Sequence, residues 1–284
     1  MATEQEIIHY YETCDIDYRL VWWTDKSFSL HYGYYDSKNT GHNDAVLNTN
    51  RILANMAGIK SGDKVLDAGC GIGGSCLWLA NKIGAQMTGI NITAYQLTKA
   101  QKLARKHELE DKIRFEKMSF LDTTFEDNTF DVVWGMESVC YAENKEEFLI
   151  EAFRILKPGG RVAVADGFIN DHDPKPEYEE MTQSWLDGWA VPNLWGQKQF
   201  IKSLDDVGFT NINFTDASRN VMPSARRMHK VASMLKIFAQ FLELIRFRNI
   251  AQSGNFRAAE YQYPLLLDDV WRYGMVVAEK PLLK

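Results

Sequence analysis

A short apolar run that passes directly into a glycine-rich turn constrains the fold of this chain more than any other feature. The run reads VLDAGCGIGG at residues 65–74, and Asp67 precedes its first glycine. Glycine adopts the left-handed backbone angles of tight turns and allows another molecule to approach the main chain closely. The sequence therefore predicts a strand, a turn and a helix, with a small, positively charged cofactor bound beside the Asp67 carboxylate.

Short β-rich runs alternate with amphipathic helical stretches after residue 62. The predicted strands are 64–68, 86–90, 113–117, 131–134 and 161–166. The predicted helices between them are 74–83, 94–107 and 145–156. This alternation predicts an α/β fold, with a doubly wound and mostly parallel sheet that has helices on both sides.

The alternation stops after residue 166, and the later chain predicts cap insertions. Two segments, at about 168–197 and 217–269, interrupt a pattern whose last strands are expected at 210–215 and 273–279. Ligands of open α/β sheets bind outside the carboxyl ends of the strands. We therefore expect an aromatic-rich lid over residues 1–60 and a ligand-binding domain over 61–284, with the two cap insertions beside the ligand.

Charge and cysteine content narrow the class of partner. The net charge of -6 argues against a broad nucleic-acid surface, which needs clustered Lys and Arg, so we expect a small-molecule substrate. The four cysteines include no Cys-x-x-Cys pair, and no metal site is predicted.

The sequence carries no sign of export or of a membrane span. Residues 1–8 lack a basic start and an apolar core, and no run of 18 apolar residues occurs. We therefore expect a cytoplasmic protein with free thiols. The amphipathic stretch at 234–247 fits a cap helix better than membrane association, and its exposed face leaves a homodimer open.

The glycines at 69, 71 and 74 also fit the Gly-x-Gly-x-x-Gly fingerprint of dinucleotide-binding proteins. Two observations argue against a dinucleotide. Asp67 would repel a pyrophosphate, and the acid expected about 20 residues further on is missing from GINIT at 89–93. A cofactor with a sulfonium or amino group fits the same residues better.

Four motifs in this order resemble those of the class I S-adenosylmethionine-dependent methyltransferases, over roughly residues 60–167. They are VLDAGCGIGG at 65–74, GINIT at 89–93, FDVV at 130–133 and LKPGG at 156–160. The resemblance implies a seven-stranded sheet whose last strand is antiparallel, S-adenosylmethionine as cofactor, and methyl transfer as the reaction.

The same resemblance implies roles for the residues of the first turn. Gly69, Cys70 and Gly71 would lie against the methionine part of the cofactor, and Asp67 would orient its amino end. Cys70 and Cys76 also fit a plain packing role, since both are small.

Two departures from the family pattern concern the ribose and the adenine. Most members have an acid at the end of the second strand, where this chain has Asn91. A subgroup with sterol and cyclopropane-forming enzymes has a neutral residue there and a glutamine one turn later, matched by Gln96. Asn91 also fits a helix cap. The adenine would contact Ser119 or the backbone of Phe120.

Aromatic side chains are concentrated in the predicted lid and the first cap insertion. The residues expected to line the substrate side are Tyr18, Trp22, Tyr32, Tyr34, Cys140, Tyr141 and Trp185. Aromatic faces suit an apolar or cationic acceptor. Packing of the cap onto the domain explains many of these rings equally well.

Glu137 and His31 are the candidate catalytic residues. Glu137 follows the fourth predicted strand, and the sterol and tocopherol-type methyltransferases that this part of the chain resembles have a similar Glu there. A carboxylate at this edge can accept a proton or stabilise a developing cation. Cofactor binding or helix capping by Glu137, and a structural role for His31, remain open.

These observations predict methyl transfer at carbon, to a prenyl-like, olefinic or aromatic acceptor. N- or O-methylation of a small amine or phenol is the first alternative. A non-catalytic, cofactor-binding partner subunit is the second.

Overall fold

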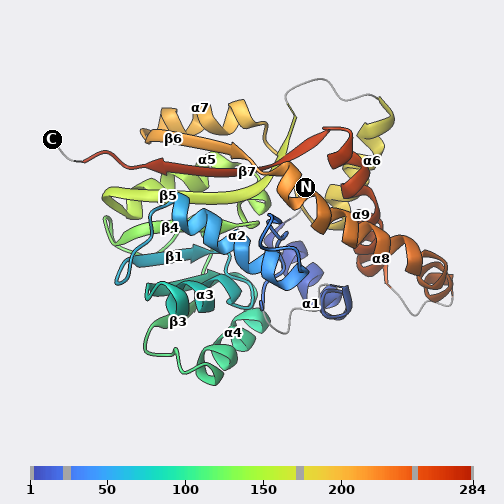
Figure 1. Cartoon of the computed structure of the whole chain (residues 1–284), viewed down its shortest axis with the longest axis horizontal. Helices are drawn as coiled ribbons and strands as arrows, with labels where there is room; N and C mark the ends of the chain where they lie inside the picture. Colours follow the sequence, from blue (N-terminus) through green and yellow to red (C-terminus); the bar gives the residue numbers. More distant parts are fainter. Residues whose placement is uncertain (1–2, 22–26, 171–175, 245–248, 283–284) are drawn as a thin grey trace.

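A single mixed sheet organises the computed structural model, which describes residues 3–21, 27–170, 176–244 and 249–282 (Figure 1). Its strands are β1 (Lys64–Ala68), β2 (Gln86–Asn91), β3 (Ile113–Lys117), β4 (Phe130–Met136), β5 (Leu156–Ile169), β6 (Thr210–Asp216) and β7 (Trp271–Glu279). They lie in the order β3-β2-β1-β4-β5-β7-β6. The predicted seven-stranded α/β fold is confirmed.

The direction of the strands fixes where a ligand binds. β1 pairs in parallel with both β2 and β4, and β5 continues the parallel set beside β4. β7 is antiparallel to its neighbours β5 and β6, as the family resemblance implied. The chain order reverses between β1 and β4, so the carboxyl ends of these two strands form the switch point at which open sheets bind ligands.

Helices cover both faces of the sheet. α2 (His42–Met56), α3 (Gly74–Lys82) and α4 (Ala94–Lys106) share one core with Val65, whereas α5 (Lys145–Ile155) and α7 (Gln197–Val207) share the other with Leu66. Neighbouring residues of a strand point to opposite faces. A strand buried on both faces is therefore apolar at consecutive positions, as β1 is at Val65 and Leu66.

The start of β5 differs from the prediction. A helix over 145–156 and a strand from 161 were expected, but α5 ends at Ile155 and β5 begins at Leu156. Its pairing with β4 jumps from Leu156 opposite Phe130 to Arg161 opposite Val132, so residues 157–160 interrupt the regular pairing. Gly159 has φ +77°, a left-handed angle that suits glycine.

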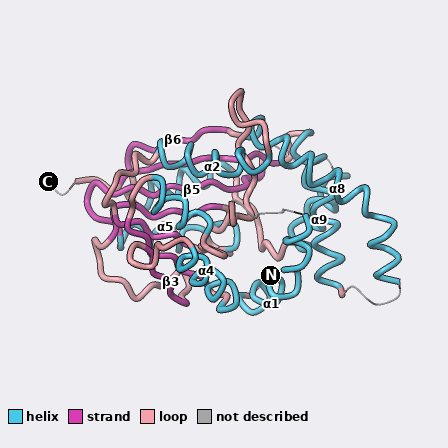
Figure 2. The backbone as a smooth tube through the Cα atoms, turned by 60° about the horizontal axis from the view of Figure 1, so that its bottom comes forward, coloured by secondary structure: helices cyan, strands magenta, loops and turns pink. Residues whose placement is uncertain are grey.

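Four helices stand beyond the carboxyl end of the sheet. They are α1 (Glu4–Val21), α6 (Pro176–Gly188), α8 (Ser218–Leu244) and α9 (Ile250–Leu267). Figures 1 and 2 both show α8 and α9 on this side. α6 and α9 approach closely at Gly188, where a Cβ would lie 2.3 Å from the carbonyl oxygen of Gly254.

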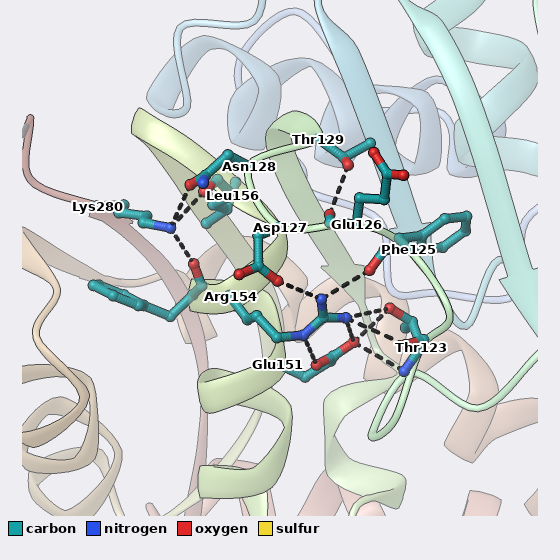
Figure 3. Close-up of polar contacts among 11 residues, drawn as sticks. Thr123, Phe125, Glu126, Asp127, Asn128, Thr129, Glu151, Arg154, Leu156 and Lys280 are labelled. Atoms are coloured by element: carbon teal, nitrogen blue, oxygen red, sulfur yellow. Dashed lines mark hydrogen bonds and ion pairs between the residues drawn. The ribbon is translucent and has the colours of Figure 1, made fainter.

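An arginine on α5 fixes the connection between β3 and β4. The Arg154 guanidinium donates hydrogen bonds to the carboxylates of Glu151 and Asp127 and to the carbonyl of Phe125, at 2.7 to 2.8 Å (Figure 3). Glu151 in turn accepts from the backbone N–H of Thr123 at 2.8 Å. This network anchors the connection between β3 and β4, whose residues 119–121 line a cavity at the carboxyl end of the sheet.

Candidate active site

A cavity of about 200 Å³ lies at the carboxyl ends of β1, β2, β4 and β5. Its floor is formed by the glycine-rich turn and by the residues that follow these strands. Its walls include Glu4, Ile7 and Tyr11 of α1, Trp185 and Leu186 of α6, and the extended segment 28–32. The cavity therefore lies between the sheet and the segments predicted as lid and cap.

Asp67 is the buried acid at the end of β1. Its side chain is 2% exposed and accepts a hydrogen bond of 3.2 Å from the thiol of Cys76. Burial raises the pKa of Asp67 to about 7, against the smaller effect of that hydrogen bond. A cationic group bound in the cavity would favour the charged carboxylate.

The turn after β1 needs its glycines for different reasons. At Gly69, with φ +88°, a Cβ would lie 2.5 Å from the Cβ of Ser138. At Gly71, with φ +53°, a Cβ would have no described atom within 4 Å, although the residue lines the cavity. Gly69 is thus required by the packing of the protein itself, whereas Gly71 leaves space beside the backbone for a ligand.

Gly74 explains how the N-terminal segment reaches the cavity. A Cβ at Gly74 would lie 2.3 Å from the carbonyl oxygen of Phe28 and 2.2 Å from the hydroxyl of Ser29. The segment 28–32 therefore crosses directly over the first residue of α3.

Asn91 and Gln96 form a polar pair at the end of β2. The Asn91 amide donates to Oε1 of Gln96 at 2.7 Å, and both residues line the cavity. The N-cap of α4 is Thr93, so Asn91 is not the capping residue. The buried hydroxyl of Thr93 has no hydrogen-bond partner among the described residues and also lies in the cavity wall.

Ser119 and Phe120 lie at the adjacent edge of the cavity. The Phe120 ring packs edge-on against Phe148, with ring centroids 5.6 Å apart. The hydroxyl of Ser119 accepts a long hydrogen bond of 3.5 Å from the backbone of Leu121. Both residues are thus placed to contact a ligand, and the choice between them as adenine contact stays a prediction.

Glu137 follows β4 and lines the cavity with an unusual backbone, φ +50°. Its Oε1 accepts hydrogen bonds from the backbone N–H of Tyr32 at 2.7 Å and from the hydroxyl of Tyr273 at 2.8 Å. Within the described part of the chain Oε2 has no partner. Burial raises the pKa of Glu137 to about 8, which these two bonds oppose. Neither donor lies in a helix, so Glu137 does not cap one.

Asp166 is an acid of the cavity that the sequence analysis missed. Its Oδ2 accepts from the backbone N–H of Cys140 at 2.9 Å and its Oδ1 from Gly167 at 2.8 Å. Burial raises its pKa. The sequence did contain a signal, because Asp166 is the last residue of a predicted strand and the carboxyl ends of parallel strands meet at one edge.

His31 is a buried, neutral imidazole in the cavity wall. Its Nδ1 lies 3.0 Å from the carbonyl oxygen of Tyr32, so this nitrogen carries the proton, and its Nε2 lies 3.5 Å from the amide of Asn50. Burial lowers the pKa of His31 to about 4. This environment fits a structural side chain better than a base that must take up a proton.

The predicted substrate residues fall into three groups. Tyr32, Cys140, Tyr141 and Trp185 line the cavity. Tyr34 is absent from the described residues that line it; its backbone N–H donates to Ala45 and Thr49 of α2. The side chain of Tyr18 and all of Trp22 lie outside the described residues.

Further aromatic residues complete the wall. They are Tyr11, Trp189, Trp271 and Tyr273. The hydroxyl of Tyr11 donates to that of Tyr141 at 2.8 Å, and the rings of Trp185 and Trp271 lie 4.9 Å apart. Tyr11 and Trp189 belong to segments whose aromatic content was noted, whereas the start of β7 gave no such signal.

The residues of this cavity fit S-adenosylmethionine. Asp67 offers a buried carboxyl group to an amino group, and the space beside Gly71 admits a ligand against the backbone. Asn91, Thr93 and Gln96 offer neutral donors and acceptors to a ribose.

The described residues contain no cluster of three or more His, Cys, Asp or Glu side chains suited to a metal ion. Within the described ranges no helix is long and apolar enough to cross a membrane.

Comparison with known proteins points to one family. Residues 66–164 match the family model described as "Methyltransferase domain". The chain is 32% identical over 213 residues to a sterol 24-C-methyltransferase of Saccharomyces cerevisiae. This match covers 74% of this chain and 54% of that protein. It is 30% identical over 217 residues to a probable tocopherol O-methyltransferase of Oryza sativa, over 72% of this chain and 60% of that one.

The chain thus spans only part of the length of these relatives, a little over half of the yeast protein. Among solved structures, the [4+2]-cyclase SpnF superposes with a TM-score of 0.81 at 23% identity, over 99% of this chain and 97% of the cyclase. At that identity the superposition speaks for the fold alone.

Proposed function

This chain contains a methyltransferase domain of the class I S-adenosylmethionine-dependent family, and from this premise we propose that it methylates a carbon atom of a small apolar acceptor. Glu137 carries the proposal, because it places a carboxylate between the cofactor turn and the aromatic wall. A relative named as a sterol 24-C-methyltransferase supports carbon as the methylated atom.

The cofactor half of the proposed site depends on three side chains. S-adenosylmethionine, when bound, supplies an electrophilic methyl group on a sulfonium. Asp67 would accept hydrogen bonds from the amino group, and Asn91 with Gln96 would hold the ribose hydroxyls, since all three side chains line the cavity. The backbone at Gly71 allows the methionine part to lie against the turn.

The acceptor half of the proposed site excludes water and stabilises the charge that develops on the acceptor. The aromatic wall holds the acceptor carbon in line with the methyl group, which lowers the entropic part of the barrier. As the new carbon–carbon bond forms and the carbon–sulfur bond breaks, the acceptor becomes positively charged. In its charged form, which prevails above its raised pKa of about 8, Glu137 would stabilise this charge and then take the proton that the acceptor loses. α1 and α6 close the cavity as the lid and cap.

O-methylation of a phenol is the second candidate. A relative named as a probable tocopherol O-methyltransferase favours it, and Glu137 would then remove the phenolic proton. The two candidates differ in the atom that carries the methyl group.

The test is a screen with isotopically labelled S-adenosylmethionine against sterol, prenylated phenol and amine acceptors, with the position of the label read by NMR. We expect label on carbon with the wild type, and loss of at least a hundredfold in turnover with Glu137→Gln at unchanged affinity for S-adenosylhomocysteine. The exposed Glu110→Gln serves as the matched control. Full turnover by Glu137→Gln would reject the catalytic assignment, and label on oxygen would select the second candidate.

A further inference from the structure

A buried lysine connects the turn after β4 to the loop between α6 and α7. Lys145 is 3% exposed and is the first residue of α5. Its ammonium donates to the carbonyl oxygens of Ala142 and Cys140 at 2.6 and 3.1 Å. It also donates to the carbonyl and side-chain oxygens of Asn193, at 2.9 and 2.7 Å.

Asn193 makes the connection reciprocal. Its side-chain amide donates to the carbonyl oxygen of Glu143 at 3.0 Å, so the nitrogen of the amide binds the turn after β4 and its oxygen binds the Lys145 ammonium. We call Lys145 and Asn193, with these hydrogen bonds, the Lys145 clamp. It is a joint between two segments that are about 50 residues apart in sequence.

The two segments that the clamp joins both contribute to the cavity wall. Cys140 and Tyr141 of the turn line the cavity, and so do Val191 and Leu194 of the loop 189–196. A shift of the loop relative to the turn would therefore change the shape of the cavity. The cofactor residues Asp67 and Asn91 lie at other strand ends and do not touch the clamp.

A packing role alone does not explain an ammonium here. Burial of the charge is costly, and a helix N-terminus repels cations. Among the described residues no carboxylate lies within ion-pair distance of Lys145, and burial lowers its pKa to about 8 against the weaker attraction of the Asp166 and Glu143 charges. A methionine would fill the same space without these costs. The ammonium is explained by its three N–H groups, which are shared among four oxygen atoms of Cys140, Ala142 and Asn193 and hold them together.

We propose that the Lys145 clamp sets the position of the cap loop 189–196 against the turn after β4, and that Lys145 is thereby a positioning residue for the acceptor. The role in acceptor binding rests on the proposed function. The mechanical role does not, because it can be measured on the protein without any acceptor.

The thiol of Cys140 reports whether the clamp is closed. It lines the cavity and is partly buried, whereas Cys14 and Cys76 are buried, are not among the described residues that line the cavity, and serve as internal references. We would measure labelling of each cysteine by N-ethylmaleimide with mass spectrometry at pH 7, together with hydrogen exchange of residues 189–196. Lys145→Met removes the ammonium, and Asn193→Leu removes the opposite partner.

In both variants we expect Cys140 to be labelled at least tenfold faster than in the wild type, and the backbone amides of residues 189–196 to exchange hydrogen faster. The affinity for S-adenosylhomocysteine should stay within twofold of the wild type. Loss of the nearby ammonium alone would lower the thiolate fraction of Cys140, so faster labelling reports exposure. Lys157→Met, which removes an ion pair with Asp131 at the opposite end of the sheet, should change neither readout.

Unchanged labelling and exchange in a folded Lys145→Met would overturn the proposal. If that variant does not fold, Asn193→Leu decides by the same two readouts. With an acceptor in hand, the KM for the acceptor should rise at least fivefold and the KM for the cofactor should not. A clamp that opens as expected while no acceptor is ever methylated would reject the proposed function and leave the mechanical role intact.

Discussion

The hydroxyl of Tyr273 donates a 2.8 Å hydrogen bond to Oε1 of Glu137, although the two residues are 136 positions apart in the chain. The contact exists because β7 is inserted antiparallel beside β5, which brings its first residues to the carboxyl end of the sheet. A hydrogen bond to a carboxylate favours the charged form. Tyr273 therefore opposes the burial that raises the pKa of Glu137 to about 8.

Tyr273→Phe should raise the pKa of Glu137 further. A hydrogen bond to a charged group is worth about 1.5–3 kcal/mol, which corresponds to a shift of about one unit or more. The acid limb of the kcat/KM profile, which reports the free enzyme, should move to higher pH by about one unit. Tyr34→Phe, which changes a ring outside the cavity wall, is the control. An unmoved limb in Tyr273→Phe would mean that Glu137 is not the titrating base.

Glu137→Gln should change how stability depends on pH. The pKa of Glu137 is about 8 in the folded protein and near 4.5 in the unfolded chain. Between these two pH values the folded protein binds more protons than the unfolded chain, so the free energy of unfolding of the wild type falls as pH rises. The variant lacks this loss. Its stability relative to the wild type should be greater at pH 9 than at pH 5, by about 1–3 kcal/mol in urea unfolding.

The comparison of the two proteins removes other groups from this measurement. Asp67, whose pKa is about 7, lowers the free energy of unfolding of both proteins as pH rises, so its contribution cancels in the difference between them. Equal stability differences at pH 5 and pH 9 would contradict a raised pKa at Glu137.

Much of the fold followed from local patterns, because alternation of apolar runs depends on residues close in sequence. The site was harder where a contact depends on strand order. Glu137 was found because it follows a predicted strand, whereas Tyr273 reaches the same cavity only through the insertion of β7 between β5 and β6. Tyr32 and Tyr34 lie in similar sequence surroundings. The backbone of Tyr34 is hydrogen-bonded to α2, however, and Tyr34 is not among the described residues that line the cavity.

Gly71→Ala should weaken cofactor binding by more than its effect on stability. Both Gly71 and Gly62 have positive φ, +53° and +85°, with no described atom within 4 Å of an added Cβ. Alanine in this conformation costs about 1–2 kcal/mol at either site. Only Gly71 lines the cavity, so Gly71→Ala should lower the affinity for S-adenosylhomocysteine at least tenfold and Gly62→Ala should leave it unchanged. If calorimetry shows equal affinities for S-adenosylhomocysteine in the two variants, the cofactor does not bind at this turn.

Asn91→Asp tests the proposed ribose site, where this chain departs from most of its family. The Asn91 amide donates to Gln96 at 2.7 Å, and its Oδ1 accepts a long hydrogen bond of 3.4 Å from the backbone N–H of Thr93, so both polar atoms of the side chain contact the protein. A carboxylate at this position would present two acceptor oxygens, and the Gln96 amide would rotate to donate to one of them. Hydrogen bonds to a charged group are worth about 1.5–3 kcal/mol, against about 0.5–1.5 for neutral ones.

The variant should therefore bind S-adenosylhomocysteine about five- to tenfold more tightly at pH 8, where a new carboxylate at this partly exposed position is charged. Asn55→Asp, on the exposed face of α2, makes the same change in net charge away from the cavity and should leave affinity unchanged. Gln96→Leu should weaken binding in the background of either residue 91, because it removes the partner that orients the side chain. Weaker binding by Asn91→Asp, with Asn55→Asp unchanged, would show that the ribose does not lie at the end of β2.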